Sequence, residues 1–317
     1  MLKKTAVLSG LFLSTALFLS GCVSSPKSQF IDANQTLLKA DTYAFESVTN
    51  IDFSTFFSLP QEEKDVMDAV KGSKVYISGT VNKPIDQYEY TFAMKNKKET
   101  LFRFPILFTP KAIYFKTNGL TNVPLFSKNQ NDSLVEATYK NYPAYDKAAS
   151  SLFASYNAVS NSLITSVAKL PEESFLPVDI SDKEKEAGVK KKVQVTLTKE
   201  AYQAFAQDAY NTFLQAYIKL PNMNVPKSEL EASQARFNNS LDVLDIDDVR
   251  LITTIGKNGE VMSNQLIIGS RAAVNDRNFK TVLHTSVVYK QINGTVSFSI
   301  NPAKERKTDI ENIFLPF

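Results

Sequence analysis

The order of apolar and polar side chains along the first half of the chain predicts a β-sheet. Apolar residues alternate with polar ones in several short runs, and a period of two is typical of strands with one buried face. The predicted strands cover residues 42–57, 75–81, 88–94, 101–108, 112–116 and 134–139. Pro105 and Pro110 are expected to break the strands around them, because proline cannot donate a backbone hydrogen bond.

A different spacing, with apolar residues three and four positions apart, predicts amphipathic helices. Two long helices are expected at 144–170 and 199–220, and each is followed by a proline. Shorter helices are expected at 32–40, 60–70 and 228–241. Residues 174–188 are rich in acidic side chains and predict a loop, and a further strand is expected at 193–197.

The last third of the chain predicts an antiparallel meander. Its four expected strands cover residues 248–256, 260–269, 279–290 and 295–300. The dipeptides Asn258-Gly259 and Asn293-Gly294 lie between paired strands, and Asn-Gly favours a hairpin turn because both residues tolerate positive φ. We therefore predict an α+β fold in which a curved antiparallel sheet packs against the two long amphipathic helices.

The N-terminal segment has the features of an export signal. Lys3 and Lys4 precede an apolar stretch from Ala6 to Phe18, which is shorter than the ~20 residues that a spanning helix needs. The segment Leu19-Ser20-Gly21-Cys22 resembles a bacterial lipobox, in which the cysteine thiol accepts a diacylglycerol and becomes the new N-terminus. An ordinary signal peptide with a chance cysteine and a single-pass anchor are the alternatives.

These boundaries divide the chain into three parts. Residues 1–21 are expected to be a lipoprotein signal peptide, and 22–30 a lipidated tether of small and polar residues. Residues 31–317 are expected to form a single α+β domain, with 171–190 as the place where two lobes could meet. We expect the protein on the extracytoplasmic face of the cell membrane, on a Gram-positive surface or on the periplasmic side in a Gram-negative host.

Composition excludes several classes of function. Lys and Arg number 36 against 33 Asp and Glu, so the net charge of +3 is too small for a nucleic-acid-binding face. The chain has one Cys and one His, His284, which excludes a Cys/His zinc site and a disulfide. The acidic run Asp242, Asp245, Asp247 and Asp248 lacks the spacing of an EF-hand. We expect no enzymatic activity, no metal and no cofactor.

Aromatic residues are unusually abundant, with 22 Phe and 13 Tyr. Five of them crowd one stretch of predicted strands: Phe102, Phe104, Phe108, Tyr114 and Phe115. Such residues either pack the sheet against the helices or line an apolar cavity for a lipid-like ligand. We take them as the candidate ligand-binding residues, beside Cys22 as the candidate lipid-attachment residue.

The lipobox at 19–22, followed by strands, helices and a C-terminal meander over roughly residues 35–300, resembles the LolA/LppX-like half-barrel lipoproteins. It is also similar to uncharacterised cell-surface lipoproteins of low-GC Gram-positive bacteria. The resemblance implies a curved sheet around helices and a role in holding a lipid or another hydrophobic small molecule. A structural subunit of an envelope complex or a surface adhesin is the alternative, and the protein partners are open.

Overall fold

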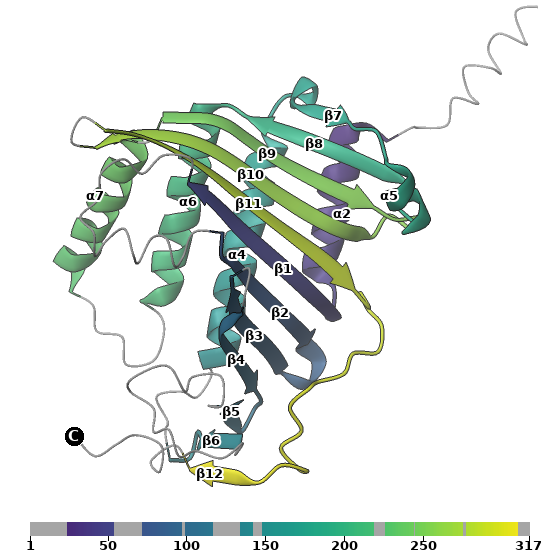
Figure 1. The fold of residues 1–317 in the computed structure, drawn as a ribbon, viewed down its shortest axis with the longest axis vertical. Helices are drawn as coiled ribbons and strands as arrows, with labels where there is room; N and C mark the ends of the chain where they lie inside the picture. The colour runs from purple at the N-terminus through teal and green to yellow at the C-terminus, as the bar shows by residue number, and fades with distance from the viewer. Residues whose placement is uncertain are drawn as a thin grey trace, which may run out of the picture.

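The chain folds around one open sheet of twelve strands (Figure 1). The computed structural model describes residues 24–53, 72–96, 99–116, 134–141, 148–218, 226–243, 245–274 and 277–309. The strand order is β12-β6-β5-β4-β3-β2-β1-β11-β10-β9-β8-β7, so the two end strands do not meet. All pairings are antiparallel except β12 with β6. The α+β class and the curved, mainly antiparallel sheet are confirmed.

The strands fall into two groups that flank the centre of the sheet. The first group contains β1 (Thr42–Phe53), β2 (Lys74–Asn82), β3 (Gln87–Lys95), β4 (Thr100–Phe108), β5 (Ala112–Lys116) and β6 (Leu134–Thr138). The second contains β7 (Phe175–Pro177), β8 (Lys191–Leu197), β9 (Asp245–Ile255), β10 (Val261–Val274) and β11 (Arg277–Lys290), and β12 (Lys307–Asp309) returns to the first. Residues 171–190 lie at one end of this single sheet.

One face of the sheet is covered by helices (Figure 1). These are α2 (Pro26–Lys39), α4 (Ala148–Ala168), α6 (Lys199–Tyr217) and α7 (Lys227–Val243), and shorter turns are formed by α5 (Asp182–Glu186), η1 (Lys83–Ile85) and η4 (Glu172–Ser174). Helix α4 packs beside α2 and α6. Helices α4 and α6, with 21 and 19 residues, lie where the two long helices were expected, and α2 and α7 extend the layer with 14 and 17 residues.

The first helix begins six residues earlier than its apolar pattern predicts. Ser25 caps it by accepting a hydrogen bond from the Ser28 amide at 3.2 Å, and Pro26 takes a first-turn position. Proline is favoured there because its ring already has a helical φ and its missing N–H needs no partner. Residues 26–30 are thus part of the fold and not of a tether, and Phe30 is buried in the core.

Two local predictions about strands are also wrong. Pro105 lies inside β4, where pairing with β5 has not yet begun, and a proline is tolerated where a strand has a partner on one side only. The expected fourth strand of the meander, 295–300, is not a strand. The position beside β11 that it would occupy is filled by β1, which pairs with β11 from Ala44 to Phe53.

The core between sheet and helices consists of two clusters that share Tyr289 and Ile292. The larger one joins α2 and α4 to strands β7–β10, and its most buried members include Val167, Val195 and Val249. The second joins strands β1–β6 through Tyr43, Val81 and other apolar residues. Since the shared residues lie at the β1–β11 junction, one continuous apolar layer runs along the helix-covered face.

Gly79 of β2 allows an aromatic ring to lie close to the backbone in this layer. A Cβ atom at this position would lie 2.5 Å from Cε1 of Phe45 and 2.9 Å from the carbonyl oxygen of Glu89. We expect Gly79→Ala to lower the free energy of unfolding by about 1–3 kcal/mol, because the ring and the neighbouring strand must shift. Urea unfolding measures this change.

Gly269 of β10 offers a matched control, because a Cβ atom there would meet nothing closer than 3.6 Å. Gly269→Ala is expected to leave the stability unchanged or to raise it slightly, since alanine loses less conformational entropy than glycine on folding. Equal unfolding midpoints for the two variants would contradict the close approach of Phe45 to the backbone.

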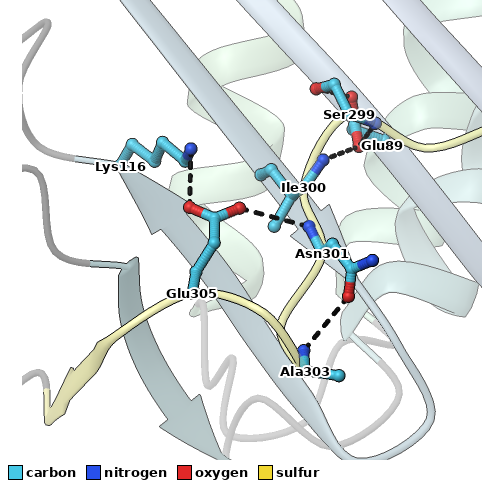
Figure 2. A network of polar contacts seen from close by, with 7 residues as sticks. All are labelled: Glu89, Lys116, Ser299, Ile300, Asn301, Ala303 and Glu305. Atoms are coloured by element: carbon cyan, nitrogen blue, oxygen red, sulfur yellow. Dashed lines mark hydrogen bonds and ion pairs between the residues drawn. The ribbon is translucent and has the colours of Figure 1, made fainter.

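The opposite face of the sheet carries the segment between β11 and β12, residues 294–306, which we call the strap (Figure 2). Ile300 and Phe298 of the strap pack on Leu107, Tyr114 and Leu134. The Glu89 carboxylate of β3 accepts hydrogen bonds from the backbone amides of Ser299 at 2.8 Å and Ile300 at 2.9 Å, and from the Ser299 hydroxyl at 2.5 Å. These contacts hold the strap on the sheet.

The strap ends by extending the sheet at the β6 edge. The Leu134 amide donates a hydrogen bond to the Arg306 carbonyl at 3.0 Å, and β12 then pairs with β6. Ion pairs join Lys116 to Glu305 at 2.6 Å and Lys307 to Glu136 at 3.1 Å. An edge strand is thereby covered by residues from the other end of the chain.

Candidate functional site

The best candidate site is a pocket of about 290 Å³ between the sheet and the helices α2 and α4. Most of its wall is apolar, with side chains from both helices and from β9, β10 and β11: Phe30, Leu37, Leu163, Leu251, Leu266 and Val287. None of the described residues that line it carries a charge. Its volume is close to ~300 Å³, the lower end of the range for small-molecule sites.

The position of the pocket follows from the register of the elements. Residues that alternate along β9 and β10 point to the helix-covered face, so Leu251 and Thr253 lie opposite Leu266 and Asn264. Helix α2 presents Phe30, Asn34 and Leu37, which are three or four residues apart and therefore share one side of the helix. The pocket lies where these two surfaces meet.

Three polar side chains line one part of this apolar pocket and bond to one another. Asn34 donates from Nδ2 to Oγ1 of Thr253 at 3.3 Å, and Thr253 donates to Oδ1 of Asn264 at 2.6 Å. Asn264 completes the ring of hydrogen bonds by donating from Nδ2 to Oδ1 of Asn34 at 2.9 Å. Asn34 and Thr253 are 6% and 1% exposed, so this Asn34–Thr253–Asn264 network is buried and held by its own hydrogen bonds.

Two more polar side chains border the pocket on β11. Thr285 shares a hydrogen bond of 3.0 Å with Thr49 of the neighbouring strand β1. Tyr289 packs edge-on against Tyr43, with 6.2 Å between the ring centroids. Tyr43 in turn contacts Phe45, which contacts Tyr90. A row of aromatic rings therefore leads from the pocket along the helix-covered face of β1 and β3.

The five aromatic residues predicted from the sequence do not line this pocket. Phe104 and Phe115 pack together at 5.6 Å, and with Phe108 they belong to the second core cluster. Phe102 lies two residues before Phe104 and therefore on the same face of β4. Tyr114 lies on the opposite face under the strap, where burial, then its hydrogen bond to Glu136, raises its pKa to about 12.

The sequence pattern does not reveal the polar pocket residues, because each is a single polar position in an otherwise apolar row. Asn34 interrupts the apolar side of α2 at the fourth position after Phe30, and a polar residue on such a stripe needs a partner when it is buried. Thr253 and Asn264 occupy inward positions of two strands in the same way. Their meeting depends on helix docking, which the local pattern does not encode.

Two of the acidic residues singled out in the sequence are held in ion pairs. Asp247 pairs with Arg271, which lowers the pKa of its carboxyl, and Asp248 pairs with Arg250 at 2.8 Å. His284 is exposed in the middle of β11. In the described ranges, no group of three or more His, Cys, Asp or Glu is placed to hold a metal ion.

The predicted signal peptide at 1–21, Cys22 and the helix expected at 60–70 lie outside the described residues. Within the described part of the chain, no helix combines the length and apolar character that a bilayer crossing requires. No protein-family model matches the chain, and no curated protein matches it in sequence.

Proposed function

We propose that this protein is an extracytoplasmic lipoprotein, anchored in the membrane by a diacylglycerol on Cys22, whose body is a non-enzymatic binding module for a hydrophobic ligand. The pocket between α2, α4 and the sheet carries this proposal, because it is apolar and without charge among its described lining residues. The half-barrel likeness to LolA/LppX-like lipoproteins is part of the same proposal. It agrees with a pocket between a curved sheet and its helices.

The size of the pocket supports a ligand of modest volume. An engineered apolar cavity of about 150 Å³ stays dry and binds benzene, so an apolar space of about 290 Å³ is large enough for a longer hydrocarbon. Burial of apolar surface contributes roughly 25 cal/mol per Å² and favours such a guest over water. The volume fits a single short chain better than a diacyl lipid.

Filling the pocket tests this proposal. Ser160 of α4 lines the pocket, so Ser160→Phe places a ring in the space that a ligand would occupy. We expect this variant to retain less than about one tenth of the hydrophobic compounds that copurify with the native protein, since overpacking a formed site excludes the guest. Organic extraction followed by mass spectrometry measures the retained amount.

Thr165 provides the control, because it lies on the same helix and is exposed. Thr165→Phe adds the same ring outside the pocket and is expected to retain the native amount. If Ser160→Phe and Thr165→Phe retain equal amounts of ligand, the pocket is not the binding site. If the native protein retains none and binds no apolar probe, the binding function itself is wrong.

The alternative of an interaction subunit or adhesin has less support. Such a protein needs a contiguous exposed apolar patch. The most exposed large apolar residues in the described ranges lie on separate elements instead: Ile85, Phe92, Leu176, Phe213 and Val288. Pull-down from envelope extracts would favour this alternative if a single partner bound Ser160→Phe and the native chain equally well.

A further inference from the structure

A count of hydrogen-bond donors in the Asn34–Thr253–Asn264 network shows what it can offer a ligand. Asn34 uses both amide hydrogens, one on Thr253 and one on the Phe30 carbonyl at 2.9 Å. Thr253 uses its single hydroxyl hydrogen on Asn264. Asn264 has two amide hydrogens and uses one of them, on Asn34. Its second N–H has no partner among the residues that the structure describes.

This remaining donor borders the pocket. Asn264 is a lining residue and is only partly buried, whereas Asn34 and Thr253 behind it are almost fully enclosed. An oxygen atom of a guest could therefore accept the remaining hydrogen bond while its hydrocarbon part lies against Leu266 and Leu251. The buried end of the pocket would then hold the polar end of the ligand.

The residues that line the pocket limit the charge that the polar end of a ligand can carry. A carboxylate, phosphate or ammonium group placed beside the network would find no counter-ion among the described lining residues. Burial of an ion without a partner is strongly unfavourable, whereas a hydroxyl or an ester carbonyl needs only a hydrogen bond. The network thus matches a neutral oxygen.

We propose that the ligand is an uncharged, single-chain amphiphile, such as a fatty alcohol or a fatty ester, whose oxygen accepts a hydrogen bond from Asn264. This inference rests on the proposed binding function and specifies the ligand class for the same pocket. Its volume of about 290 Å³ favours one chain over two. The uncharged end enters the pocket, and the network orients it.

Calorimetric titration of the full chain with three probes tests the proposal. The chain carries Cys22→Ser, which removes the proposed diacylglycerol, and the titration is run without detergent because detergent would compete for the pocket. The probes are 1-octanol, octanoate and benzene. Octanol is expected to bind at least ~100-fold more tightly than octanoate at pH 7.5, because only the protonated acid fits and carboxylic acids have a pKa of about 4.5. Octanoate binding should strengthen about tenfold for each pH unit lowered from 8 to 6.

Two variants locate the contact. Asn264→Leu is expected to weaken octanol binding about tenfold, the effect of losing one hydrogen bond, and to leave benzene binding unchanged or stronger. Ser263→Ala is the control, because it also removes a polar group from β10, but Ser263 does not line the pocket and shares its hydrogen bond with Thr254. It should retain the native preference for octanol.

The outcomes separate this inference from the function on which it rests. Octanoate that binds as tightly as octanol, without pH dependence, shows that the polar end stays in solvent, which overturns the inference and leaves the binding function intact. Equal losses of octanol binding in Asn264→Leu and Ser263→Ala also overturn it. If neither octanol nor benzene binds, both the inference and the function fail.

Discussion

A Cys22→Ser variant is expected to leave the membrane fraction and to appear in the soluble fraction. The chain has a single cysteine, and a diacylglycerol thioether can form only on a thiol. One acyl chain gives marginal membrane binding and two chains give stable anchoring, so loss of the diacylglycerol removes the whole anchor. Partition into a detergent phase and incorporation of labelled palmitate measure the change.

Ser24→Ala is the matched control, since it alters a small residue two positions after the cysteine and keeps the thiol. It should partition into the detergent phase as the native protein does and incorporate label to the same extent. A Cys22→Ser protein that stays in the membrane would show that residues 1–21 act as an uncleaved anchor or that another contact holds the protein there.

Glu89→Gln is expected to release the strap from the sheet. The carboxylate is 7% exposed and accepts from two backbone amides and one hydroxyl, with both of its oxygens engaged. A glutamine side chain has one oxygen, so it can keep the two amides but cannot also accept from the Ser299 hydroxyl, and it carries no charge. Losing one hydrogen bond, together with the charge that strengthens the other two, is expected to cost about 1–3 kcal/mol.

Limited trypsin digestion and thermal unfolding measure the release of the strap. Cleavage after Lys304 and Arg306 should be at least about tenfold faster in Glu89→Gln, and the thermal midpoint should fall. Glu305→Gln is the control, because it weakens the partly exposed ion pair with Lys116 and such pairs contribute about 0–1 kcal/mol. Equal cleavage rates for the two variants would show that Glu89 does not hold the strap.

Local chemistry was sufficient to predict most strands but not their order. Alternation identified β2 and β3, apolar runs identified β4 and β5, and β6 was also expected. The Asn258-Gly259 turn joins β9 to β10 as expected, with Gly259 at a φ of +83°. At the second Asn-Gly pair Asn293 has a φ of +54° but Gly294 does not have a positive φ, and the chain leaves the sheet there. The competing partner, β1, comes from the far end of the sequence.

The candidate site was harder to predict for the same reason. The abundance of aromatic residues pointed to the helix-covered face, and Phe104, Phe108 and Phe115 do lie in its core. The pocket lies farther along this face, where α2 docks on β9 and β10. Its polar network joins Asn34 to residues 219 and 230 positions away, so no pattern within a short window could reveal it.

The pairing of β1 with β11 has a consequence for the time at which the protein can fold. Contacts across this pair join residues 236 and 244 positions apart, and they lie in the middle of the sheet. Pairing at such sequence separation is slow, because the loop-closure entropy must be overcome before contacts form. If the chain is exported with its N-terminus first, its sheet stays incomplete until β11 has followed β1 across the membrane. Late closure of this kind would keep an exported chain unfolded during translocation.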